Sequence, residues 1–136
     1  MMVLQDKILG PGGALDELAA LDADIAAAIA QYGPPPDRSL PATFDTLARS
    51  VIGQQISRSA ASAIWQRMQD QNLSTADTIA RMSPAALMPV GLSQRKAEYL
   101  IGIANEVTSG QLDFEALQHL SGDAVQARLV KIRGIG

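Results

Sequence analysis

Apolar residues recur three and four positions apart along most of the chain, which is the spacing of one face of an α-helix. Residues 14–31 show this pattern and are followed by Gly33 and the prolines at 34–36. Because proline lacks an N–H and fixes its own φ angle, we expect one helix over residues 14–31 and a rigid extended connector up to Pro41. The apolar face of this first helix consists of Leu15, Leu18, Leu21, Ile25 and Ile29.

The rest of the chain predicts shorter helices joined by short loops. They are expected over residues 43–56, 58–69, 75–81, 93–108 and 113–119, with a short helix opened by Ser83-Pro84 and a last one starting at Ser121 to Asp123. Ser57 and Ser93 stand where a side-chain oxygen caps a helix N-terminus. The residues expected on buried faces are Phe44, Leu47, Val51, Ile52, Ala61, Ile64, Trp65, Met68, Ala97, Leu100, Ile101 and Ala104. No useful stretch alternates as a strand would, so the predicted fold class is all-α, in a single domain over residues 1–136.

Composition excludes several kinds of site. The 136 residues include no cysteine, which rules out disulfides, thiolate metal sites and cysteine-ligated iron–sulfur clusters within them. The one histidine, His119, has no suggestively spaced carboxylate partners and is expected to be solvated or to cap a helix end. No cofactor is therefore expected. No apolar run approaches the ~20 residues of a membrane span, and no signal-peptide pattern is present, so we expect a cytoplasmic protein.

Charge is unevenly distributed along the chain. The net charge is −3, but residues 1–45 carry seven acids against Lys7 and Arg38, whereas residues 46–136 carry nine bases against seven acids. This asymmetry leaves room for a weakly basic face in the second part of the chain. A mildly acidic domain with ordinary solvated faces is equally compatible with these numbers.

Two adjacent glutamines, Gln54 and Gln55, follow Gly53 at the end of an otherwise apolar helix. Burying two amides without partners costs a few kcal/mol, so a surface or cleft is the economical place for them. An amide side chain at a helix junction can enter a duplex in place of an extruded base, or bond to the base left opposite. An ordinary exposed helix end is the alternative interpretation.

Two cations, Arg95 and Lys96, lie in the first turns of the helix that Ser93 caps. Cations at a helix N-terminus oppose the helix dipole, which suggests that they serve another purpose, such as binding a phosphate. The alternative is an exposed helix face with Glu98 nearby.

The last residues, Gly134-Ile135-Gly136, follow a predicted helix and resemble a tight hairpin. Glycines on both sides of an apolar residue let the backbone turn sharply, so that amide N–H groups converge on a phosphate oxygen. Leu129, Ile132 and Ile135 would pack around the hairpin. A simple helix C-cap is the alternative interpretation.

In this order and spacing, the three segments resemble the 3-methyladenine DNA glycosylase II family of the helix-hairpin-helix DNA glycosylase superfamily. The resemblance extends over residues 14–136, and residues 1–13 are expected to be an N-terminal tail. The matching residues are Phe44, Val51-Ile52-Gly53-Gln54-Gln55-Ile56-Ser57, Gly91-Leu92-Ser93, Lys96-Ala97, Leu100, Leu129 and Ile132-Arg133-Gly134-Ile135-Gly136.

The resemblance implies a base-excision repair enzyme that binds double-stranded DNA, flips out an alkylated purine such as 3-methyladenine and hydrolyses its N-glycosidic bond. It implies that Gln55 is the wedge that fills the vacated stack, with Gln54 at the estranged base. It also implies a monovalent cation on the backbone carbonyls of Val130, Arg133 and Ile135. The DNA-binding residues implied are Gln54, Gln55, Ser57, Lys96, Arg133, Gly134, Ile135 and Gly136.

The family's catalytic aspartate and its second hairpin helix would fall beyond Gly136, so the fold is expected to be incomplete and the chain inactive, with no catalytic residue among its 136 residues. Asp113 and Asp123 precede the hairpin, at predicted helix-capping positions. Leu129, Ile132 and Ile135 are then expected to form an exposed patch that promotes self-association through residues 120–136. A non-catalytic helical DNA-binding module and a plain helical interaction domain are the alternatives.

Overall fold

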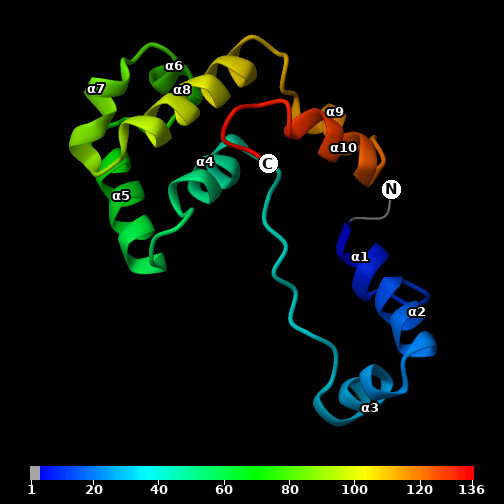
Figure 1. Ribbon diagram of the computed structural model, residues 1–136. Coiled ribbons are helices and arrows are strands. Elements are labelled where there is room, and N and C mark those ends of the chain that lie inside the picture. The colour runs from blue at the N-terminus through cyan, green and yellow to red at the C-terminus, as the bar shows by residue number, and fades with distance from the viewer. Residues whose placement is uncertain (1–3) are drawn as a thin grey trace. The chain divides into compact units, whose positions relative to one another are not determined.

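The structure, a computed structural model, describes residues 4–136, and every regular element among them is helical (Figure 1). This confirms the all-α class. The chain divides between Leu40 and Pro41 into two compact units. Whether these units form the single domain expected over residues 1–136 stays a prediction. No helix in the described part of the chain is long and apolar enough to cross a membrane.

The first unit contains α1 (Leu4–Leu9), α2 (Ala14–Leu21) and α3 (Ala23–Tyr32). The single helix predicted over residues 14–31 is wrong, because Asp22 interrupts it. The Asp22 carboxylate accepts the backbone N–H groups of Asp24 at 2.9 Å and Ile25 at 3.1 Å, and so caps α3. Helix α1 lies within residues 1–13, whose role as an N-terminal tail stays a prediction.

Neither α2 nor α3 has a buried residue. Leu21, which lies on the predicted apolar face, is 86% exposed. The chain then leaves α3 at Gly33, whose φ of +79° suits glycine, and runs without helix to residue 40, as the prolines predict. In this segment the backbone N–H of Ser39 donates to the Asp37 carboxylate at 2.9 Å, which lowers the pKa of that carboxyl.

The second unit contains the remaining helices. They are α4 (Phe44–Ile52), α5 (Arg58–Asp70), α6 (Ala76–Ala80), α7 (Pro84–Leu87), the 3₁₀ helix η1 (Met88–Val90), α8 (Gln94–Thr108), α9 (Phe114–Leu117) and α10 (Gly122–Leu129). Side-chain oxygens cap seven of these helices, as the sequence predicts for Ser57 and Ser93. The capping residues are Thr43, Ser57, Thr75, Ser83, Ser93, Asp113 and Ser121.

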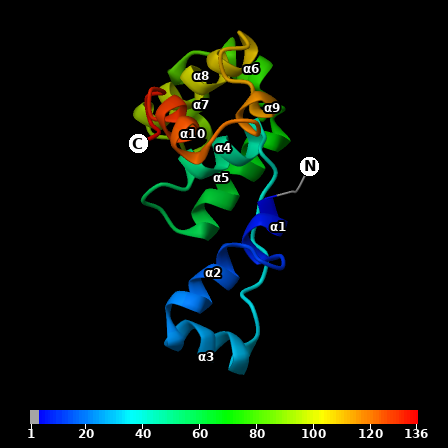
Figure 2. The same cartoon turned by 90° about the vertical axis from the view of Figure 1, so that its right-hand side faces the viewer.

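Helix α8 is the centre of this unit and packs against α4, α6 and α7 (Figures 1 and 2). Its Leu100 and Ile103 are fully buried, whereas Ile101, expected inside, is half-buried. The largest fully buried side chains of the core are those of Ile52, Met68, Ile79, Leu87, Leu100 and Ile103. This packing fixes α4 relative to α8, and with it the segment that follows α4.

Candidate nucleic-acid interface

Helix α4 ends at Ile52 rather than at the predicted residue 56, and the chain continues as a turn over residues 53–56, here called the glutamine turn. The N–H of Gln54 donates to the Val51 carbonyl at 3.2 Å. Gln55 has a φ of +59°, in the left-handed region that non-glycine residues rarely adopt. Both glutamines are exposed, which confirms their predicted place on the surface. A non-glycine residue in this region carries backbone strain that its surroundings must offset.

The last residues, Gly134–Gly136, form a second turn, here called the glycine turn. It begins where the Ile135 N–H donates to the Ile132 carbonyl at 3.1 Å. Gly134 has a φ of +98°, and a Cβ atom added there would lie 2.5 Å from Cγ of Tyr99. Glycine is therefore required at this position for both its backbone angle and its close contact with α8.

The two turns meet on one face of the second unit. The side-chain Nε2 of Gln54 donates to the Gly134 carbonyl at 3.1 Å. Figures 1 and 2 both show the C-terminal segment beside α8. An open hollow of about 510 Å³ lies between the turns. Its lining residues are Gln54, Gln55, Tyr99, Gly134, Ile135 and Gly136. The structure thus brings together the two segments that the sequence singled out at opposite ends of the unit.

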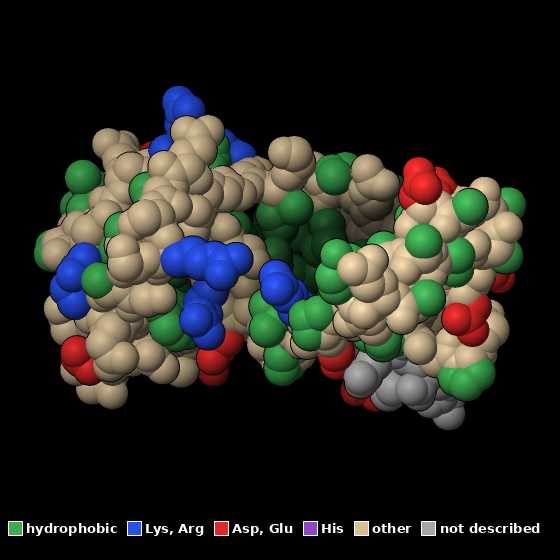
Figure 3. Space-filling view, turned by 90° about the horizontal axis from the view of Figure 1, so that it is seen from below, with side chains coloured by type: hydrophobic (Ala, Val, Ile, Leu, Met, Phe, Trp, Pro, Cys, Tyr) green, Lys and Arg blue, Asp and Glu red, His purple; other side chains and the backbone are tan. Residues whose placement is uncertain are grey.

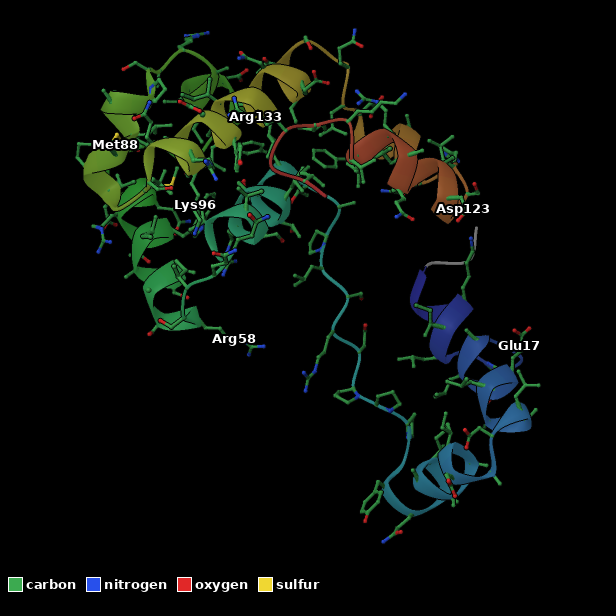
Figure 4. The ribbon with its side chains drawn as sticks, in the orientation of Figure 1. Glu17, Arg58, Met88, Lys96, Asp123 and Arg133 are labelled. Carbon is green, nitrogen blue, oxygen red and sulfur yellow. The ribbon has the colours of Figure 1, made fainter. Side chains whose placement is uncertain are left out.

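Lys96 joins the same assembly from α8 (Figure 4). Its Nζ donates to the Ile52 carbonyl at 2.7 Å and to the Gln54 carbonyl at 2.6 Å. These carbonyls belong to the last residue of α4 and to the glutamine turn. The predicted phosphate contact of Lys96 stays a prediction, and two of its three N–H donors already have acceptors in the protein.

Ser57 follows the glutamine turn directly, and Arg133 directly precedes the glycine turn. The Arg133 side chain is 76% exposed, lies 5.7 Å from the centre of the Tyr99 ring and 3.8 Å from the Glu98 carboxylate. The Ser57 hydroxyl accepts the Ala60 N–H at 3.1 Å, so it caps α5. On the face drawn in Figure 3, Lys and Arg side chains gather on the larger part, at the left of the view. This agrees with the basic second part of the sequence.

The backbone of the glycine turn offers donors and acceptors. The amides of Gly134 and Gly136 donate no hydrogen bond to any residue that the structure describes. Within residues 4–136, the carbonyls of Val130, Arg133 and Ile135 likewise accept none. These three carbonyls remain the predicted site for a monovalent cation. Over the same residues, no cluster of His, Asp or Glu is arranged to hold a metal ion.

The predicted exposed patch is wrong. Ile132 is only 6% exposed, and Leu129 and Ile135 pack against the core. The hairpin segment folds back onto α8 and largely covers Leu129, Ile132 and Ile135 within the unit, whereas Val130 is 49% exposed. Self-association through residues 120–136 stays a prediction. Tyr99, which had no role in the predicted site, lies against Gly134 and supports the glycine turn. Its position one turn along α8 from Lys96 was the only available signal.

Comparison with known proteins identifies the family of this chain. Residues 48–133, which lie entirely in the second unit, match the HhH-GPD superfamily of base excision DNA repair proteins. The chain belongs to this superfamily. Its helical fold also matches solved structures of glycosylases in that group.

The chain is similar to several 3-methyladenine DNA glycosylases of this kind. A DNA-3-methyladenine glycosylase of Bacillus subtilis is 31% identical over 110 residues, which cover 71% of this chain and 36% of the relative. The crystal structure of a DNA-3-methyladenine glycosidase from Bacillus halodurans matches with a TM-score of 0.77 and 34% identity, over 88% of this chain and 56% of the other. A 3-methyladenine DNA glycosylase of Schizosaccharomyces pombe, solved with abasic DNA, matches with a TM-score of 0.70 and 31% identity, over 90% and 64%. The chain therefore spans about a third of the curated relative and just over half of the first solved one.

Proposed function

We propose that the chain binds double-stranded DNA containing alkylated bases as part of a base-excision repair glycosylase. The reaction is hydrolysis of the N-glycosidic bond of an alkylated purine such as 3-methyladenine, after the base has been flipped out. The hydrogen bond between Gln54 and Gly134 carries this proposal. It joins the glutamine turn, which holds the candidate wedge Gln55, to the glycine turn, which is the candidate phosphate site. The relative solved with abasic DNA supports DNA as the ligand.

Gln55 is the proposed wedge. Its exposed amide stands at the tip of the glutamine turn and lines the hollow. Extruding a base leaves a gap in the stack and an unpaired partner base, and an amide can fill the first and bond to the second. The neighbouring Gln54 amide donates one N–H to the Gly134 carbonyl, so its second N–H and its oxygen remain for the proposed contact with the estranged base.

The glycine turn is the proposed phosphate site. The amides of Gly134 and Gly136 have no acceptor among the described residues, and converging backbone N–H groups form an anion-binding concavity. The exposed guanidinium of Arg133 adds a positive charge beside this turn, and Ser57 and Ile135 complete the proposed contact surface. The monovalent cation on the carbonyls of Val130, Arg133 and Ile135 belongs to the same proposal.

No Asp or Glu is among the side chains that line the hollow. Asp113 caps α9 through the N–H groups of Glu115 and Ala116, and Asp123 lies in the first turn of α10. The 136 residues therefore supply DNA binding and base flipping in this proposal, and no carboxylate at the proposed site. This observation favours one alternative function, a non-catalytic helical DNA-binding module, which would use the same surface.

Binding to defined duplexes tests the proposal. We would titrate the 136-residue chain into fluorescent DNA that carries one stable abasic-site analogue, and into the same duplex without it. We expect tighter binding to the abasic duplex, because the gap for Gln55 is already open. The preference should disappear in Gln55→Ala. Equal dissociation constants for the two duplexes in the unaltered chain would contradict the proposal.

A further inference from the structure

The ammonium group of Lys96 occupies an unusual place for a proposed DNA-contacting cation. Lys96 is half-buried as a residue, and its ammonium group lies within hydrogen-bond distance of two main-chain carbonyls, at 2.7 Å from Ile52 and 2.6 Å from Gln54. The last carbonyls of a helix have no partner within the helix and carry its negative partial charge. The Lys96 ammonium group, from α8, donates to the last carbonyl of α4, that of Ile52, and to the Gln54 carbonyl in the turn that follows.

One of these carbonyls is decisive for the glutamine turn. The Gln54 carbonyl belongs to the peptide bond that connects Gln54 to Gln55, and Gln55 adopts a φ of +59°. A non-glycine residue persists in this region only where its surroundings hold it. By fixing the plane of that peptide, Lys96 holds the backbone from which the Gln55 side chain projects.

We infer that Lys96 is a positioning residue, which orients the glutamine turn from α8 and does not need to touch DNA. The inference rests on the proposed function, since it concerns the wedge role of Gln55. It also extends to the glycine turn, because the main chain of Gln54 is held by Lys96 while its side chain holds Gly134. One side chain of α8 thus supports both halves of the proposed interface.

Arg95 offers a matched control. It lies next to Lys96 on α8 and is exposed, and its side chain forms no hydrogen bond or ion pair with residues 4–136. The variants Lys96→Met and Arg95→Met each remove one positive charge from the start of the same helix. A difference in DNA binding or hydrogen exchange between the two variants is therefore due to the hydrogen bonds of Lys96 and not to the loss of a positive charge.

The experiment measures binding to abasic and undamaged duplexes over a salt series, together with hydrogen exchange at the amides of Gln54 and Ile56. We expect Lys96→Met to bind the abasic duplex about tenfold more weakly than Arg95→Met, with the same salt slope and faster exchange in the turn. Lys96→Arg keeps the charge and the donors, and should restore most of the exchange protection. Fluorescence of the buried Trp65 shows that each variant is folded.

Three outcomes would overturn the inference. The first is equal binding and exchange in Lys96→Met and Arg95→Met. The second is a salt slope lowered by about one in Lys96→Met relative to Arg95→Met, with unchanged exchange, which indicates a direct phosphate contact. The third is a folded Lys96→Arg that behaves like Lys96→Met. If the unaltered chain shows no preference for abasic DNA, the proposed function fails, while the exchange data still decide whether Lys96 orders the turn.

Discussion

The side-chain amide of Gln54 donates a hydrogen bond to the main-chain carbonyl of Gly134, across 80 positions of sequence and a distance of 3.1 Å. A side chain after α4 thereby holds the backbone after α10. Neither turn depends on its own local sequence alone, so changes in one are expected to reach the other.

The first prediction concerns this contact. Gln54→Ala removes the donor and should loosen the glycine turn, with hydrogen exchange at the Ile135 amide increasing severalfold. Because the bond is exposed, the free energy of unfolding should fall by no more than about 1 kcal/mol. Gln55→Ala is the control, since that side chain donates nothing to Gly134. Unchanged exchange at Ile135 in Gln54→Ala would show that the contact does not order the turn.

The second prediction concerns Gly134. Alanine there meets both a φ of +98° and the Tyr99 side chain, with Cβ to Cγ at 2.5 Å. We expect Gly134→Ala to lower the free energy of unfolding by about 2 kcal/mol or more, and to weaken DNA binding. Thermal unfolding and the duplex titration measure the two effects.

Gly102→Ala is the matched control for that substitution. Gly102 lies within α8, and a Cβ there would meet nothing within 4 Å. Alanine in a helix interior is favoured over glycine by about 0.8–1.0 kcal/mol, so Gly102→Ala should raise stability and leave DNA binding unchanged. If Gly134→Ala is as stable as the unaltered chain, the close contact with Tyr99 does not constrain the turn.

The third prediction separates backbone strain from function at Gln55. Glycine relieves the cost of a φ of +59° but adds freedom to the unfolded chain, so Gln55→Gly should change stability by less than about 1 kcal/mol. Its preference for abasic DNA should nevertheless be lost, because the wedge side chain is gone.

Asn72→Gly controls for the backbone effect. Asn72 is the other non-glycine residue with a positive φ in the described part of the chain, at +57°, and it follows α5 outside the hollow. This variant should match Gln55→Gly in stability and retain the preference for abasic DNA. Retention of that preference in Gln55→Gly would remove Gln55 from the wedge role.

Structural features that depend only on neighbouring residues could be predicted from the sequence. Ser57 and Ser93 cap the helices they were expected to cap, because a hydroxyl reaches the N–H groups of the next turn in any context. The break at Asp22 was missed, although its cause is also local. The periodic leucines and isoleucines on both sides predicted a continuous helix, whereas the Asp22 carboxylate competes for the backbone amides of Asp24 and Ile25.

Features that depend on tertiary contacts could not be predicted in this way. Lys96 finds its acceptors on Ile52, 44 positions away, and on Gln54, 42 positions away. Ile132 was expected to be exposed because no covering helix was expected among the 136 residues, yet the segment folds back onto the core and buries it. The residues of the proposed interface could therefore be chosen from the sequence. Their hydrogen-bond partners could be identified only from the structure.

The fourth prediction concerns catalysis. We expect the 136-residue chain to bind abasic DNA without releasing 3-methyladenine from alkylated DNA. Acid–base help from a positioned carboxylate contributes roughly 10²–10⁴-fold, and no Asp or Glu lines the hollow. The carboxylate of Glu98, which precedes Tyr99 on α8, accepts from Gln94 at 3.2 Å and lies 3.8 Å from Arg133. Released bases would be quantified by chromatography against a boiled sample and an active glycosylase. Turnover above the boiled sample would place a catalytic carboxylate within these residues, and Glu98→Gln would then be the first variant to examine.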